Sequence, residues 1–235
     1  MEFLGYYVCG ILVLVTIFIA LGAQAKVHSA YNKYKKEVSP LDITGADLAR
    51  KLAEQNHISI NLRSCSGQLS DHYDPRDKSL NISQENFNSK SVAAHAIVAH
   101  EFGHALQDAE NYAPLKVRQA TVKIANAMST MLVPMIILGL LFELFLFAGV
   151  GNVLIYIYIG LYSVSFVVSL VTLPVEFNAS RRAKECLTSL GVTGQDQDGV
   201  SDVLNAAAWT YVASMLVSLA YLLRLLALLR IFSRD

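Results

Sequence analysis

Apolar residues along the chain gather in long runs separated by polar stretches, a pattern typical of membrane proteins. The first run, Phe3–Ala23, carries no charged residue. A helix of this length crosses about 30 Å of hydrocarbon at about 1.5 Å rise per residue. Met128–Phe147 and Asn152–Val175 follow as two runs joined by a short uncharged connection, and a last run begins at Ala206. The pattern therefore predicts about four transmembrane helices.

Two of these predictions have alternatives. The first run could be a secretory signal peptide, but no basic residue precedes it, and it is longer than the apolar core of about 7–15 residues typical of such peptides. The middle runs could be buried core helices, yet a soluble core of this size rarely needs two consecutive apolar stretches of about 20 residues. We expect residues 1–23 to be an uncleaved anchor and residues 128–175 to be a transmembrane hairpin.

Residues 24–127 are polar enough to form a water-soluble part. Helical spacing marks Ile43–Gln55, and a short strand is expected at Ile58–Leu62. The segment Ser66–Ser83 predicts two short strands around the turn residues Asp74–Asp77. Ser91–Asp108 is predicted helical, with a serine available as cap and no proline inside.

The rest of the chain divides into a polar stretch, residues 176–205, and a last segment, residues 206–235, predicted as a transmembrane helix with its tail. Lysines and arginines follow the first run, precede the second and follow the third. Because such residues gather on the cytoplasmic side, we expect the soluble part in the cytoplasm and the N-terminus outside. Arg230 and Arg234 would then lie outside, which counts against a complete fourth crossing. We expect the protein to reside in a bacterial plasma membrane.

Composition supports a membrane protein and excludes other classes. Hydrophobic residues make up 54% of the chain and charged residues 16%, against about 25% charged residues in soluble domains. Nineteen basic and nineteen acidic residues leave no net charge, so no nucleic-acid partner is expected. The three cysteines Cys9, Cys65 and Cys186 contain no CxxC pair, which gives no disulfide framework and favours a reducing compartment.

The strongest chemical signal is the sequence His100-Glu101-Phe102-Gly103-His104. Residues four apart on a helix lie about 40° apart around its axis, so both imidazoles can reach one zinc ion. Glu101 can take a proton from the water that zinc activates without itself ligating the metal. A chance match is the alternative, but the motif lies among strong helix formers, as this chemistry requires.

A catalytic zinc needs a third protein ligand, and the candidate is Glu176. No third histidine follows the motif in the next turns, where Gln107 and Glu110 stand. Glu176 comes directly after the predicted hairpin, which returns the chain to the membrane face that carries His104. The alternative is that Glu176 is only a helix cap or an interfacial acid.

The segments HEFGH, a membrane hairpin and EFNASRRA together resemble the YugP-like membrane zinc metallopeptidases, relatives of the HtpX and CAAX-protease gluzincins. SDHYDPRDKSLNIS and VLNAAAWTYVA add to the resemblance, which covers nearly the whole chain. It implies an α-helical membrane protein with a small α+β zincin-like soluble part. It also implies a gluzincin-type zinc endopeptidase with one zinc ion on His100, His104 and Glu176 and with Glu101 as its base.

The expected partners follow from this activity: a peptide or protein substrate in or near the membrane, the lipid bilayer, and a second copy or a regulatory membrane protein.

Ser180 and Asn178 depart from the resemblance, since aspartates are expected at both positions. A membrane scaffold with a degenerate or structural metal site therefore remains the alternative function.

Candidates for stabilising the oxyanion are His72, Tyr73, Arg181 and Arg182, whereas His95 is expected to face away from the zinc. The strand around Leu80–Ser83 is expected at a sheet edge, where it could pair with an extended peptide.

Overall fold

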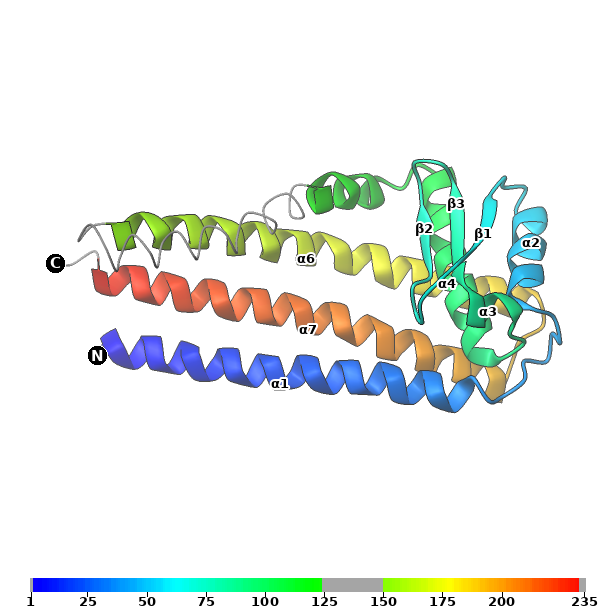
Figure 1. The fold of residues 1–235 in the computed structure, drawn as a ribbon, viewed down its shortest axis with the longest axis horizontal. Helices are drawn as coiled ribbons and strands as arrows, with labels where there is room; N and C mark the ends of the chain where they lie inside the picture. The colour runs from blue at the N-terminus through cyan, green and yellow to red at the C-terminus, as the bar shows by residue number, and fades with distance from the viewer. Residues whose placement is uncertain (1, 124–149, 233–235) are drawn as a thin grey trace. The chain divides into compact units, whose positions relative to one another are not determined.

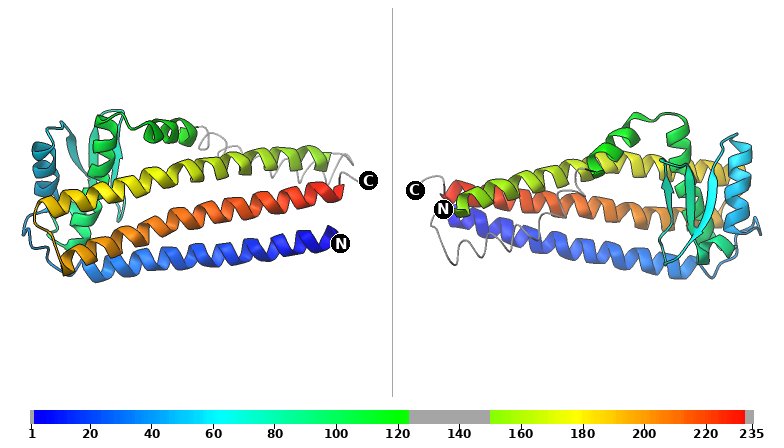
Figure 2. Two further views of the ribbon diagram at one scale, coloured as in Figure 1. Left: turned by 180° about the vertical axis from the view of Figure 1, so that it is seen from behind. Right: turned by 45° about the horizontal axis from the view of Figure 1, so that its top comes forward.

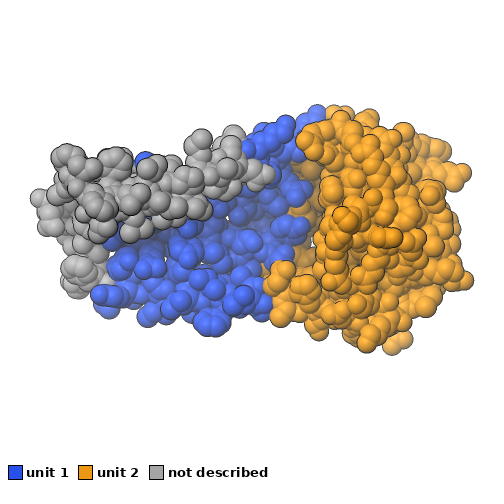
Figure 3. Space-filling view, in the orientation of Figure 1, with its two compact units in different colours: residues 1–22, 116–173, 210–235 blue, residues 23–115, 174–209 orange. Residues whose placement is uncertain are grey.

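The computed structural model describes residues 2–123 and 150–232. Contacts divide the chain into two compact units, coloured separately in Figure 3. Unit 1 comprises residues 1–22, 116–173 and 210–235, and unit 2 comprises residues 23–115 and 174–209. The three long helices α1 (Glu2–Tyr34), α6 (Val150–Ser189) and α7 (Gln195–Phe232) each contribute residues to both units.

Within unit 1, segments of the three long helices lie side by side (Figures 1 and 2). Arg224 of α7 donates a hydrogen bond of 2.9 Å to the Tyr6 hydroxyl of α1, and its guanidinium lies 4.9 Å from the centre of the Tyr6 ring. Tyr162 of α6 stacks on Tyr221 of α7 with ring centroids 5.0 Å apart. Polar side chains and aromatic rings thus connect helices whose outer surfaces are apolar.

Among the described residues, three helical segments are long and apolar enough to cross a membrane: Leu4–Tyr34, Tyr156–Ser189 and Gln195–Arg230. These segments overlap three of the four apolar runs seen in the sequence. The remaining predicted span, residues 128–147, lies outside the described residues, so the prediction of four crossings stays a prediction.

The helices extend beyond the apolar runs that predicted them. Helix α1 continues to Tyr34 rather than ending near Ala23, and α7 begins at Gln195 rather than at Ala206. The additional turns pack within unit 2, where Tyr34 is buried and its hydroxyl donates a 2.6 Å hydrogen bond to Asp202. Hydrophobicity marks where a helix can enter lipid, but this packing decides where the helix stops.

Unit 2 contains a three-stranded sheet made of β1 (Asn61–Cys65), β2 (His72–Asp74) and β3 (Ser79–Ser83), in the order β1-β3-β2. Strand β3 runs parallel to β1 and antiparallel to β2, and its side chains Leu80 and Ile82 are completely buried. The prediction that Leu80–Ser83 forms an edge strand is therefore wrong, because both of its sides are already paired. Strand β1 also begins later than the predicted Ile58–Leu62.

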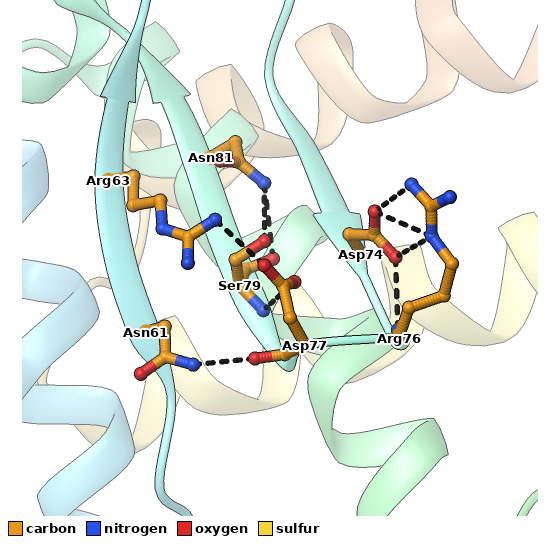
Figure 4. Close-up of polar contacts among 7 residues, drawn as sticks. All are labelled: Asn61, Arg63, Asp74, Arg76, Asp77, Ser79 and Asn81. Carbon is orange, nitrogen blue, oxygen red and sulfur yellow. Dashed lines mark hydrogen bonds and ion pairs between the residues drawn. The ribbon is translucent and has the colours of Figure 1, made fainter.

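The turn between β2 and β3 is held by its own polar side chains (Figure 4). The Asp77 carboxylate accepts hydrogen bonds from the backbone N–H of Ser79 and from Arg63 on β1, at 3.2 and 2.7 Å. The carbonyl of Asp77 accepts a third from Asn61, at 2.6 Å. One turn residue therefore fixes the register of both β1 and β3, and the predicted pair of strands around Asp74–Asp77 is confirmed.

Helices α2 (Gly45–Gln55), α3 (Gln84–Asn88) and α4 (Val92–Ala109) complete unit 2. The Ser91 hydroxyl caps α4 by accepting a 3.2 Å hydrogen bond from the Ala94 N–H, as the sequence predicted. Helix α4 is buried on nearly all sides, and Phe102 at its middle is completely inaccessible to solvent. A helix that is covered all around holds its side chains in fixed positions, which suits the motif it carries.

Candidate metal centre

Helix α4 presents His100 and His104 one turn apart, with their ring centroids 5.0 Å from each other. Helix α6 supplies Glu176, whose side chain is 2% exposed. Both histidine side chains are buried as well, at 11% and 8% exposed. The structure thus brings together the three residues that the sequence predicted as zinc ligands, although 72 residues separate His104 from Glu176 in the chain.

The distances from Glu176 to the two histidines are close to those between ligands of a small tetrahedral metal ion. Nε2 of His100 lies 3.2 Å from Oε2 of Glu176, and Nε2 of His104 lies 3.7 Å from the same oxygen. One ligand atom from each residue falls within 4.8 Å of the others. Two ligands bound to zinc at about 2.0–2.1 Å in tetrahedral geometry are roughly 3.3–3.4 Å apart. Two imidazoles and one carboxylate are also the donor set of known catalytic zinc sites.

Each histidine is oriented by a hydrogen bond at its other nitrogen. Nδ1 of His100 lies 3.2 Å from the Ser180 hydroxyl, and Nδ1 of His104 lies 3.0 Å from Oε1 of Gln107. The role of Gln107 beside His104 was not predicted from the sequence, where this position counted only as one that lacks a third histidine. Its spacing was the available signal, because a side chain three residues after His104 lies on the same helical face.

Close contact between the backbones of α4 and α6 brings the ligands together. A Cβ atom added to Gly103 would lie 2.6 Å from the carbonyl oxygen of Ala179, well inside the normal contact distance. Glycine at this position lets α6 approach the face of α4 next to both histidines. The glycine of HEFGH is therefore required by the helix packing that positions Glu176.

Glu101 lies beside the ligands and is held by strand β2. Its Oε2 accepts a 3.1 Å hydrogen bond from the backbone N–H of Tyr73. Burial raises the pKa of Glu101 from 4.5 to about 7; His100 opposes this rise, and the negative charges of Glu176 and Asp71 add to it. A carboxylate with a pKa near neutrality is suited to accept and release a proton at physiological pH.

The four candidates for oxyanion stabilisation are engaged elsewhere. The Tyr73 hydroxyl donates to Asp108 at 3.0 Å, and burial raises its pKa. Arg181 is paired with Glu185, Arg182 forms a two-bond ion pair with Glu110, and His72 is exposed and contacts its neighbour Ser70. Each of the four candidates thus has a partner outside the three ligands.

His95 faces away from the ligands, as its helical position predicted. Its Nε2 lies 2.9 Å from the carbonyl oxygen of Ile43, an atom that can only accept a hydrogen bond. The proton of the neutral ring is therefore on Nε2. His95 therefore contributes to the packing of α4, and the histidines of α4 at the candidate metal centre are His100 and His104.

Comparison with known proteins gives the family. A family model described as "Putative neutral zinc metallopeptidase" matches residues 9–230. The chain belongs to this family. It is 36% identical over 215 residues to "Putative membrane protease YugP" of Bacillus subtilis (strain 168), a match that covers 91% of this chain and 92% of the relative. No solved structure matches the chain.

Membership of this family agrees with the residues that the fold brings together. A zinc metallopeptidase needs a metal-binding cluster, and His100, His104 and Glu176 are the only such group of histidine, cysteine and acidic side chains found among the described residues. The apolar helices of membrane-spanning length found in residues 2–123 and 150–232 are in keeping with the name "Putative membrane protease YugP" of the Bacillus subtilis relative. The protein is therefore a membrane-associated member of a zinc peptidase family.

Proposed function

We propose that this protein is a gluzincin-type membrane endopeptidase with a zincin-like soluble part. His100, His104 and Glu176 bind a single zinc ion, and Glu101 is the general base. The observation that carries the proposal is the convergence of three buried ligand atoms within 4.8 Å, supplied by two helices that are far apart in sequence. Burying two imidazoles and a carboxylate together is costly unless a cation or a proton compensates the charge.

Zinc bound there would supply a Lewis acid and lower the pKa of its water. Glu101 removes the proton from the attacking water and later delivers it to the nitrogen of the leaving amine. The Tyr73 N–H keeps one carboxylate oxygen of Glu101 in place while the other stays available for this transfer. The burial that brings the pKa of Glu101 to about 7 makes both uptake and release of the proton favourable.

The site would act at the cytoplasmic surface of the membrane. Glu176 follows the apolar run Asn152–Val175 without a break in α6, so the ligand is on the same helix as a candidate span. Lysines and arginines flank the apolar runs on the side where the soluble part begins and ends. A peptide segment of a membrane protein, or one held close to the bilayer, is the substrate that such a location favours.

The alternative of a scaffold with a degenerate site receives no support from the two departures from the family pattern. Ser180 contacts Nδ1 of His100, and Asn178 accepts hydrogen bonds from Gln107 and Arg182. Both residues therefore act around the ligands without carrying a negative charge. Neither replaces a ligand or the base.

Cleavage of an unfolded test protein by detergent-purified wild type and Glu101→Gln, with bound zinc measured in each, tests the proposal. We expect the variant to retain zinc and lose cleavage by several orders of magnitude, because the amide cannot accept the proton. Glu54→Gln, the same change at an exposed position of α2, is the control and should cleave like wild type. Equal cleavage by Glu101→Gln and wild type, unaffected by a chelator, would refute the peptidase mechanism and favour the scaffold.

A further inference from the structure

A hydrogen-bond chain leads from His104 to the surface of unit 2. Nδ1 of His104 lies 3.0 Å from Oε1 of Gln107, whose side chain is completely buried. Nε2 of Gln107 in turn contacts Asn178, and Asn178 contacts Arg182. The outer end is Glu110, which binds the two terminal nitrogens of Arg182 at 2.6 Å each.

The direction of every bond in this chain is determined by groups that have only one possible role. A glutamine amide can be turned by 180°, which would place its NH₂ group toward His104. The carbonyl oxygen of Val175 prevents this, because it lies 2.9 Å from Nε2 of Gln107 and can only accept. The NH₂ group must therefore face Val175, and Oε1 must face His104.

Asn178 is fixed in the same way from the other side. Its Oδ1 lies 2.7 Å from Nε of Arg182, and a guanidinium group can only donate. The same Oδ1 accepts from Nε2 of Gln107 at 2.9 Å. Because Oδ1 receives both bonds, Arg182 and Asn178 reinforce the orientation that Val175 imposes on Gln107.

The consequence falls on the His104 ring. An acceptor at Nδ1 requires the proton of the neutral imidazole to be on Nδ1, which leaves the lone pair of Nε2 free. Nε2 is the atom that lies 3.7 Å from Glu176. His100 is held less strictly, because the Ser180 hydroxyl at its Nδ1 can either donate or accept.

We propose that Gln107, supported by Asn178 and Arg182, is a positioning residue that selects the metal-binding tautomer of His104. The proposal rests on the proposed function in taking His104 as a zinc ligand. A neutral amide performs the role that a carboxylate often has beside a metal-bound histidine. The positive charge of Arg182, at the outer end of the hydrogen-bond chain, is compensated by Glu110.

The tautomer can be measured without zinc and without activity. In nitrogen-15 NMR spectra of metal-free protein labelled at histidine, recorded near pH 8, protonated and bare ring nitrogens have separate signals. Wild type should show His104 protonated at Nδ1, with the signal assigned by its loss in His104→Gln. His95 is an internal reference of the opposite tautomer, since its Nε2 faces the Ile43 carbonyl.

Gln107→Leu should shift His104 toward the Nε2-protonated form and weaken zinc binding on the order of 10- to 100-fold, measured by competition with a chromogenic chelator. Gln84→Leu, the same change at an exposed position, should alter neither quantity. Asn178→Asp keeps an acceptor for both donors, Gln107 and Arg182, and should keep His104 protonated at Nδ1. Asn178→Leu should cause a smaller loss than Gln107→Leu, because Val175 still holds Gln107.

A Gln107→Leu protein with an unchanged His95 signal, wild-type zinc affinity and His104 still protonated at Nδ1 would overturn the proposal. If Gln107→Leu fails to fold, Gln107→Met, which also lacks the amide oxygen but keeps the length of the side chain, replaces it, and the same result would overturn the proposal. Failure of the proposed function gives a different pattern. Wild type would then bind no zinc, while the tautomer shift in Gln107→Leu would still test the hydrogen-bond chain.

Discussion

Replacing Gly103 by alanine should separate the zinc ligands without altering any of them. The new Cβ would lie 2.6 Å from the Ala179 carbonyl oxygen and 3.1 Å from its Cα. Both are backbone atoms of α6, which cannot rotate away as the end of a side chain can. Restoring an ordinary contact of about 3.4 Å requires α4 and α6 to move apart by roughly 0.8 Å, whereas metal–ligand distances tolerate about 0.2 Å.

The size of the effect follows from the cost of this overpacking. Overpacking typically costs about 1–3 kcal/mol, and the metal-free protein can relieve it by letting the two helices separate. Zinc binding must bring the two helices back together, so the free energy of zinc binding should weaken by the same amount, about 1–3 kcal/mol. At about 1.4 kcal/mol per factor of ten, zinc affinity should fall about 5- to 150-fold. Thermal stability of the metal-free protein should change less, since alanine in a helix regains about 1 kcal/mol relative to glycine.

The assay is zinc affinity by chelator competition, together with thermal unfolding of the metal-free protein. Gly160→Ala is the matched control, because it makes the same change in α6 at a position where no described atom lies within 4 Å of the new Cβ. It should bind zinc like wild type. Wild-type zinc affinity in Gly103→Ala would refute the conclusion that this helix contact sets the ligand geometry.

Two further predictions concern groups next to the candidate metal centre. Burial lowers the pKa of His95 from its ordinary value of 6.5, so the folded state favours the neutral ring. As the pH falls below 6.5, the unfolded chain takes up a proton at His95 before the folded state does, and the folded state loses stability. The unfolding temperature of wild type should therefore fall from about pH 7 to about pH 5 more steeply than that of His95→Gln, and parallel curves would contradict this account. Tyr73→Phe removes the hydroxyl bonded to Asp108 but keeps the N–H bonded to Glu101. It should lower stability by about 1 kcal/mol and cleavage by less than tenfold, whereas a 10²- to 10³-fold loss of cleavage would identify the hydroxyl as the oxyanion donor after all.

The sequence by itself determined the features that depend on local periodicity. A spacing of four residues on a helix is enough to place His100 and His104 on one face. Long apolar runs are enough to locate three helices of membrane-spanning length, because lipid imposes a minimum length and composition. Glu176 was predicted as the partner of the two histidines because the expected hairpin, part of which lies outside the described residues, would return the chain to the side from which it left.

Only the tertiary structure decided which groups contact one another across the fold. Strand β3 was expected at an edge, but pairing with both β1 and β2 places it in the middle, and no local pattern encodes that order. Gln107 acquires its role from Val175 and Asn178, which lie 68 and 71 residues away along the chain. The close approach at Gly103 likewise depends on the backbone of α6. These contacts result from packing distant segments together, and a sequence read along the chain records only neighbours within a few turns.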